Sequence, residues 1–273
     1  MPRTQGRNQL HATQVVGVCE RDAPLVEVHP PAVTDLDRAT AAHVAERIRD
    51  GSTVQAGIGA IPNAILSMLV DHEHLGLHTE LLSDGAVDLV EAGALTGIAK
   101  STNPGKLVAT FVLGTRRTYD FVHENAAVEL WPVEVVNDPR TIGLERRFVS
   151  INATLEVDLL GQCASETIGG RYWSGSGGQA DFARGARYSP EGQGFIVLRS
   201  TAKGGTISRI VSQLGPGQVV TTMKNTVDMV VTEHGVAELR GRSVAKRAEA
   251  LIAIAHPDHR DRLRHDAKAM GLL

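Results

Sequence analysis

Apolar residues recur along the chain in two alternating patterns, one typical of helices and one typical of strands. Helices are predicted over 35–50, 62–70, 86–92 and 243–254, followed by a more polar helix over 257–270. Short runs rich in Val, Leu and Ile predict strands over 53–56, 77–82, 106–113, 133–137, 148–158, 194–199, 218–222 and 227–232. Because strands alternate with helices, we predict an α/β fold with a mostly parallel sheet flanked by helices.

The first 32 residues follow neither pattern. Pro30 and Pro31 force an extended backbone and prevent a helix in this segment. Thr34 then precedes a helical pattern whose first turn carries Asp35 and Asp37, where carboxylates favour the positive end of the helix dipole. We therefore expect an N-terminal arm over 1–32 and one α/β domain over 33–273.

The composition is that of an ordinary soluble globular protein, with 42% hydrophobic and 22% charged residues. A net charge of −3 makes binding to nucleic acid through phosphate contacts unexpected. No apolar stretch has the length of a membrane span, and the N-terminus lacks the apolar core of a secretory signal. We therefore expect a cytoplasmic protein without a membrane partner, and its two cysteines provide no disulfide framework.

A glycine-containing turn follows the first predicted strand, in the stretch QAGIGAIP. Gly57 and Gly59 allow a tight turn, and the next helix, with Pro62 in its first turn, directs its N-terminal amides at negative charge. Pro62 stands where a dinucleotide-binding fingerprint would have its third glycine, so that motif is absent. A tight turn without any ligand explains the same pattern.

Glu80 is a carboxylate within the otherwise apolar predicted strand LHTELL. Burying a carboxylate is costly unless it is paired or used, so Glu80 is a candidate general base or covalent nucleophile. The alternative is that Glu80 lies on a solvent-facing side of the strand, as most charged residues do.

A second glycine-rich loop, Ser174 to Gly178, has small residues whose N–H groups can point at an anion, a carbonyl or an oxyanion. A flexible connection without function is the alternative.

The segment from Thr232 to Arg242 is predicted as a turn whose charges either bind a partner or cap a helix. His256 and His259 lack a further ligand set at zinc spacing, so no metal site is expected, and no serine-hydrolase elbow is present.

Taken in order, several stretches resemble the acetyl-CoA hydrolase/transferase family, specifically its carboxyl-terminal domain and its 4-hydroxybutyrate and butyrate CoA-transferase branch. The resemblance runs from about Pro30 to the end of the chain. The matching stretches are QAGIGAIPNAIL, LHTELLSDGAVDL, VVNDP, SINATLEVDLLGQ, SGSGGQADFARGA, VVTEHGVAELRG and ALIAIAHP.

This resemblance implies a set of functional residues. Glu80 would attack acyl-CoA and become a glutamyl-CoA thioester, with CoA a substrate and no cofactor tightly bound. Gly177 and Gly178 would contact the thioester carbonyl and CoA, and Asn137 and Lys203 would lie near the active site or CoA. The backbone of the first glycine turn would bind CoA and help form the oxyanion hole, through Gln55, Ala56, Gly57, Ile58 and Gly59.

The resemblance predicts transfer of CoA from an acyl-CoA to a short-chain carboxylate such as 4-hydroxybutyrate, butyrate or acetate. Two alternatives stand beside it, an acyl-CoA hydrolase and a non-catalytic CoA-binding subunit. Family members carry an amino-terminal domain of similar architecture, and their active site lies between the two halves. The alternatives are a separate subunit that supplies that domain, a second copy in a homodimer, and a truncated gene product.

Overall fold

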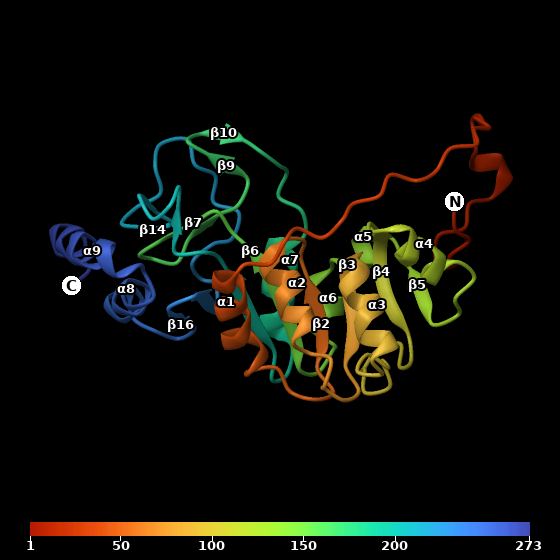
Figure 1. Ribbon diagram of the computed structural model, residues 1–273, viewed down its shortest axis with the longest axis horizontal. Coiled ribbons are helices and arrows are strands. Elements are labelled where there is room, and N and C mark those ends of the chain that lie inside the picture. Colours follow the sequence, from red (N-terminus) through yellow and green to blue (C-terminus); the bar gives the residue numbers. More distant parts are fainter.

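The computed structural model describes residues 1–273 and confirms the α/β class. Its centre is a nine-stranded sheet in the order β1-β5-β4-β3-β2-β6-β11-β15-β16 (Figure 1). All neighbouring strands are parallel except β15 and β16 at one edge. The strands are β1 (Gln5–Gly6), β2 (Thr53–Ala56), β3 (Gly76–Leu82), β4 (Leu107–Val112), β5 (Val128–Leu130), β6 (Phe148–Ala153), β11 (Gln193–Val197), β15 (Met229–Thr232) and β16 (Gly235–Glu238).

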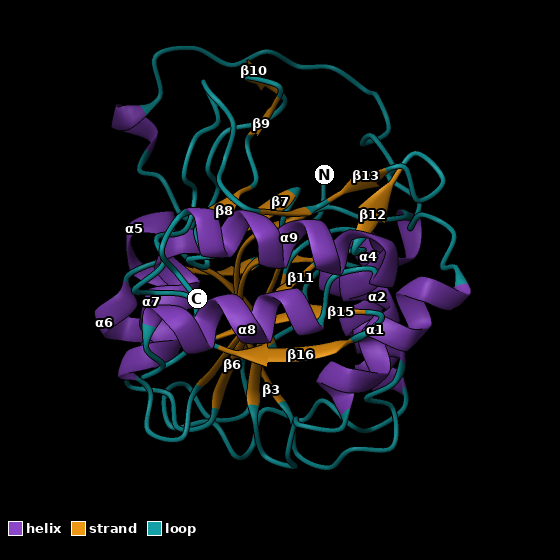
Figure 2. Ribbon diagram, turned by 90° about the vertical axis from the view of Figure 1, so that its left-hand side faces the viewer, coloured by secondary structure: helices purple, strands orange, loops and turns teal.

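Helices cover both faces of this sheet (Figure 1). One face carries α1 (Asp35–Ala45), α2 (Ala60–Ser67) and α3 (Asp84–Glu91), and the other carries α5 (Val133–Val136), α6 (Pro139–Ile142) and α7 (Gln179–Tyr188). The helix α4 (Arg116–Val122) follows β4, while α8 (Val244–Ala253) and α9 (Pro257–Ala269) lie together beside β16 (Figure 2). Because helices cover both faces, the strands β2 and β15 are buried at every position.

Several short strands stand apart from the large sheet. A three-stranded sheet contains β7 (Glu156–Asp158), β8 (Cys163–Ala164) and β14 (Ile210–Val211). Two hairpins are formed by β9 (Thr167–Ile168) with β10 (Arg171–Tyr172) and by β12 (Thr201–Ala202) with β13 (Ile207–Ser208). In Figure 1, β7, β9, β10 and β14 lie above the large sheet.

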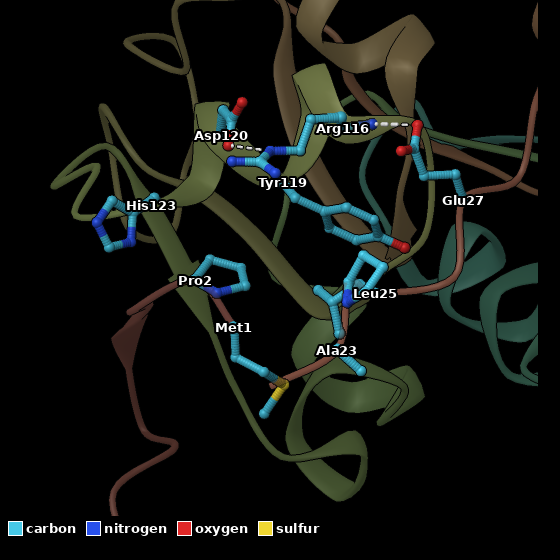
Figure 3. Close-up of a pocket in the computed structure, with 10 residues that line it drawn as sticks. Met1, Pro2, Ala23, Leu25, Glu27, Arg116, Tyr119, Asp120 and His123 are labelled. Carbon is cyan, nitrogen blue, oxygen red and sulfur yellow. Dashed lines mark hydrogen bonds and ion pairs between the residues drawn. The ribbon is translucent and has the colours of Figure 1, made fainter. Parts of the chain in front are cut away.

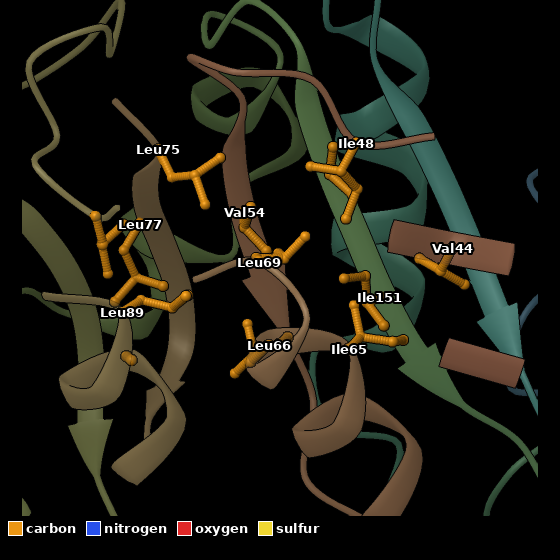
Figure 4. Packing of buried hydrophobic residues seen from close by; sticks show 14 of the residues in the cluster. Val44, Ile48, Val54, Ile65, Leu66, Leu69, Leu75, Leu77, Leu89 and Ile151 are labelled. Carbon is orange, nitrogen blue, oxygen red and sulfur yellow. The ribbon is translucent and has the colours of Figure 1, made fainter. Parts of the chain in front are cut away.

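The main hydrophobic core lies between the sheet and the helices α1, α2 and α3 (Figure 4). Ile65 and Leu69 of the α2 region are fully buried there, as are Val44 of α1 and Ile151 of β6. A second core packs α8 and α9 against the β15–β16 end of the sheet.

None of the helices combines the length and apolar character that a membrane span requires.

The order of the strands creates a switch point between β2 and β6. From β2 the chain adds β3, β4 and β5 on one side, and it then returns to β6 and adds β11 and β15 on the other. Because the connections that leave β2 and β6 diverge, a crevice forms at the carboxyl ends of these two strands. Ligands of open parallel sheets commonly bind at this kind of crevice.

The N-terminal segment packs along the β5 edge of the sheet. Its strand β1 pairs in parallel with β5, and a 3₁₀ turn follows over Ala12–Gln14. Further along, the Tyr119 hydroxyl of α4 donates to the Val26 carbonyl across 2.8 Å, and the Arg116 amide donates to Glu27 across 2.8 Å (Figure 3). Thr34 then caps α1. The division into an arm over 1–32 and a domain over 33–273 stays a prediction.

Two strand predictions are wrong. The segment 133–137 forms the helix α5, because Pro132 begins a helical turn in which the amides of Val135 and Val136 both donate to its carbonyl. This local turn overrides the preference of consecutive valines for strands. Residues 218–222 form no strand, and only Thr222 makes an isolated bridge, to Cys163.

Other elements were divided or not predicted. The predicted strand over 148–158 is interrupted at residues 154 and 155, between β6 and β7. The predicted turn after Thr232 contains β16, which closes an antiparallel hairpin with β15. The sequence pattern did not predict α4, β5, α6 and α7, which have few large apolar residues or short spans, nor the two-residue strands β1, β8, β9, β10, β12, β13 and β14.

Candidate active site

A cavity of about 290 Å³ lies at the switch point. It brings together the turn after β2, the β3 carboxylate and the second glycine-rich loop, which are far apart in the sequence. The predicted site residues that line it are Gln55, Ala56, Gly57, Ile58, Glu80, Gly177 and Gly178.

Glu80 lies on β3 and is half-buried at the wall of this cavity. The buried side chain of Asn137 donates from Nδ2 to Glu80 Oε2 across 2.8 Å. Asn137 ends the short helix α5, which packs on β3 and β4. The contact orients one carboxylate oxygen of Glu80 and leaves Oε1 without a hydrogen-bond partner in the protein. Glu80 is therefore held in one orientation and is not a freely solvated surface group.

Gly178 caps the N-terminus of α7 directly beside this pair. A methyl group at Gly178 would overlap Glu80 Oε2 and would lie 2.5 Å from Asn137 Nδ2. Only glycine therefore allows the backbone to approach the carboxylate so closely. The first amides of a helix have no partner within it, so the N-terminus of α7 presents free N–H groups near Glu80.

The first glycine turn is held by a buried polar network between β2 and β6. Gln55 and Asn152 exchange two side-chain hydrogen bonds of 3.1 and 3.0 Å, and Ser150 donates to Gln55 Oε1 across 3.0 Å. The Gly57 amide donates to the Ile151 carbonyl across 2.9 Å. The Gln55 side chain is thus engaged within the protein, and the network fixes the backbone that lines the cavity.

Asn152 is a site residue that sequence reasoning missed. It lines the cavity and is buried at the end of β6. Its signal in the sequence is two polar residues, Ser150 and Asn152, on the same side of an apolar strand.

Three predicted residues lie outside the lining of the cavity, and one of them, Asn137, instead lines a neighbouring cavity that also contains Glu80. Gly59 has a φ of 133° and caps α2, so it shapes the turn. Lys203 lies in the exposed turn between β12 and β13 with a φ of 48°. Its proximity to CoA stays a prediction.

The site is flanked by negative charge on the α5 side. A neighbouring cavity is lined by Glu80, Glu134, Asp138 and Asp181. Burial raises the pKa of Asp181 above its usual value, and the charges of Glu80 and Asp138 add to this effect, opposed by Arg184.

No cluster of three or more His, Cys, Asp or Glu side chains has the arrangement of a metal site.

This geometry provides the parts that covalent acyl-group chemistry needs. A carboxylate is a weak nucleophile and gains from a fixed orientation. Amide donors placed beside it, from Asn137 and from the N-terminus of α7, suit a developing oxyanion. The loop Ser174 to Gly178 and the turn after β2 provide further backbone amides around the same cavity.

Comparisons with known proteins point to one family. The model of the acetyl-CoA hydrolase/transferase C-terminal domain matches residues 114–267, more than half of the chain. The match includes Asn137, Gly178 and Lys203, whereas Glu80 and the first glycine turn precede it.

Similar proteins cover nearly the whole chain. Succinyl-CoA:cyclohexane-1-carboxylate CoA transferase of Geobacter metallireducens is 52% identical over 99% of the chain, and 4-hydroxybutyrate coenzyme A transferase of Clostridium kluyveri is 46% identical over 98%. The crystal structure of RipA from Yersinia pestis superimposes on all of the chain with a TM-score of 0.95 at 39% identity. The chain spans 62% of the length of each of these three proteins.

Proposed function

Because the chain belongs to the acetyl-CoA hydrolase/transferase family, we propose that it moves CoA from an acyl-CoA to a short-chain carboxylate, with Glu80 as the nucleophile. The observation that carries this proposal is the position of the Glu80 carboxylate. It lies in the switch-point cavity between the Asn137 amide and the glycine-capped N-terminus of α7. The names of the two curated relatives, both CoA transferases, support the same reaction class.

The reaction proceeds in two balanced halves. A carboxylate oxygen of Glu80 attacks the thioester carbonyl carbon, the C–S bond breaks and CoA leaves as a thiolate. The resulting mixed anhydride is attacked by the thiolate at the Glu80 carbonyl carbon, which releases the first carboxylate and leaves a glutamyl-CoA thioester. A second carboxylate then reverses these steps and departs as the new acyl-CoA. No ATP is needed, because the thioester energy is kept throughout.

The protein lowers the barriers of these steps by positioning and by electrostatics. Negative charge develops on the carbonyl oxygen of each tetrahedral intermediate. The free amides at the N-terminus of α7 and in the turn after β2 are the groups that would stabilise it. Asn137 holds the Glu80 carboxylate in the orientation for attack, which removes part of the entropic cost of the reaction.

The test is intact-protein mass spectrometry of the purified protein, in its native assembly, after mixing with butyryl-CoA. We expect a mass increase that corresponds to CoA on the wild-type chain and none on Glu80→Gln. The matched control is Glu134→Gln, which removes the same charge from an exposed position near the cavity and should keep the adduct.

Three results would contradict the proposal or change it. An absent adduct on the wild type, or an equal adduct on Glu80→Gln, overturns Glu80 as the nucleophile. CoA release that does not depend on added acetate would make the protein an acyl-CoA hydrolase, in which water resolves the glutamyl-CoA thioester.

A further inference from the structure

His78 is a buried histidine that the proposed reaction does not use. It precedes Glu80 by two residues on β3, so both side chains emerge on the same face of the strand. The ring is only 1% exposed, and its Nε2 lies 2.7 Å from the carbonyl oxygen of Val136. Because a carbonyl only accepts hydrogen bonds, Nε2 must carry the proton, and Nδ1, which has no partner, is unprotonated.

The surroundings keep this ring neutral. Burial, helped by the positive charge of Lys100, lowers the pKa of His78 to about 4, against the opposing effects of the hydrogen bond to Val136 and the charge of Glu145. Lys100 and Glu145 form an ion pair with an Nζ–Oε1 distance of 3.7 Å, and both side chains are fully buried. At neutral pH the ring is thus a hydrogen-bond donor with a single available tautomer.

The acceptor of this bond leads directly to Glu80. Val136 is the last residue of α5, and Asn137 follows it in the chain. The helix α5 has only four residues, too few to hold its own position by internal hydrogen bonds. The bond from His78 therefore ties the end of α5 to β3 immediately before the residue whose amide binds Glu80.

His78 also contacts the other side of the site. Its ring meets the ring of Phe182 edge-on, with centroids 6.4 Å apart and an interplanar angle of 69°. Phe182 lies in the first turn of α7, and its Cε2 is 3.0 Å from where a Cβ of Gly178 would be. The same buried ring thus supports both the Asn137 backbone and the helix end that approaches Glu80.

We propose that His78 is a positioning residue, whose Nε2–H bond to the Val136 carbonyl sets Asn137 at the distance from which its amide orients Glu80. This inference rests on the proposed role of Glu80 as the nucleophile. His78 does not touch the reacting atoms, and its effect passes through Asn137.

The test compares two substitutions that differ in this one hydrogen bond. His78→Phe keeps an aromatic ring but removes the donor, whereas His78→Gln keeps an N–H group at about the position of Nε2. We measure the rate of CoA adduct formation from butyryl-CoA by quenched-flow mass spectrometry. His78→Phe should lower the saturating rate about tenfold with little change in the half-saturating concentration, and His78→Gln should restore most of that rate.

A matched control comes from another histidine with the same kind of bond. The Nε2 of His72 lies 3.2 Å from the carbonyl oxygen of Ile48, and neither residue lines the switch-point cavity. His72→Phe should therefore leave the rate of adduct formation unchanged. Thermal unfolding of each variant shows whether it is folded, and His78→Asn, whose amide is too short to reach Val136, replaces His78→Phe if that variant does not fold.

A double variant separates positioning through Asn137 from an independent effect. If His78 acts through Asn137, then His78→Phe should cause no further loss of rate in an Asn137→Ala background. Equal rates for wild type and His78→Phe, or losses that multiply in the double variant, would overturn the inference. Failure of the proposed function looks different, because the wild type would then form no adduct or Glu80→Gln would form one.

Discussion

Asn137 Nδ2 lies 2.8 Å from Glu80 Oε2, although 57 residues separate the two in the chain. Asn137 ends a short helix on one side of β3, and Glu80 emerges from the strand itself. This amide is the only hydrogen-bond donor in the protein to the Glu80 side chain. The orientation of the candidate nucleophile therefore depends on a residue from a different element.

Asn137→Ala should slow formation of the CoA adduct about a hundredfold, the size of effect seen when one amide donor is removed from an acyl-transfer site. CoA affinity, measured by calorimetry, should change little, because Asn137 acts on Glu80. The same substitution at Asn8, which is exposed near the N-terminus, provides the control. A variant that keeps the wild-type rate would show that Glu80 needs no orientation by this amide.

Gly178→Ala should abolish adduct formation while the protein stays folded. The added methyl group would occupy the space of Glu80 Oε2 and crowd Asn137 Nδ2, so the half-buried Glu80 side chain would turn away. Gly215→Ala is the matched control, because a Cβ there meets only Gln218 Cγ, at 3.9 Å. Adduct formation and the melting temperature report the two effects separately, and a fully active Gly178→Ala would refute the close approach.

Lys100→Met should lower the free energy of unfolding by about 3 kcal/mol, because it leaves the buried Glu145 carboxylate without its counter-charge. Glu145 keeps hydrogen bonds from the Ser101 and Thr102 amides, which soften but do not cancel the loss. Adding Glu145→Gln to Lys100→Met should recover a large part of the stability. Urea denaturation at pH 7 measures each step, and equal stability of Lys100→Met and wild type would contradict the prediction.

His78 should make stability fall in mild acid. Its pKa in the folded state is about 4, below the ordinary value of 6.5, because burial penalises the charged ring. Between these two pH values His78 binds more protons in the unfolded chain than in the folded protein. The free energy of unfolding therefore rises with pH over this window and decreases as the pH falls toward 4. His78 alone should lower the free energy of unfolding by about 3 kcal/mol across this window.

The difference between wild type and His78→Gln isolates this effect. Urea denaturation of both proteins at pH 7 and at pH 4.5 should show a larger loss for the wild type. The carboxylates titrate in both proteins, so their effects on stability cancel in the comparison. An equal loss in the two proteins would show that His78 charges without cost in the folded state.

The sequence predicted the fold class and several central strands correctly. Segments rich in Leu and Val at β3 and β4 identify strands that are buried by helices, because such strands need apolar residues on both faces. Pro132 and the glycine-rich segment before Thr222 mark where this rule failed. There, local turns decided the backbone and the side-chain pattern did not.

For the site, the chain itself indicated Glu80 and the two glycine segments as candidates, because a carboxylate in an apolar strand is costly to bury and clustered small residues leave backbone N–H groups accessible. Only the tertiary structure decided that Glu80 faces a cavity and that Asn137 and Gly178 meet at its Oε2. It also brought Asn152 to Gln55 and His78 to Val136. Periodicity is a property of neighbours in the chain, whereas these contacts depend on strand order and on how α5 and α7 pack against the sheet.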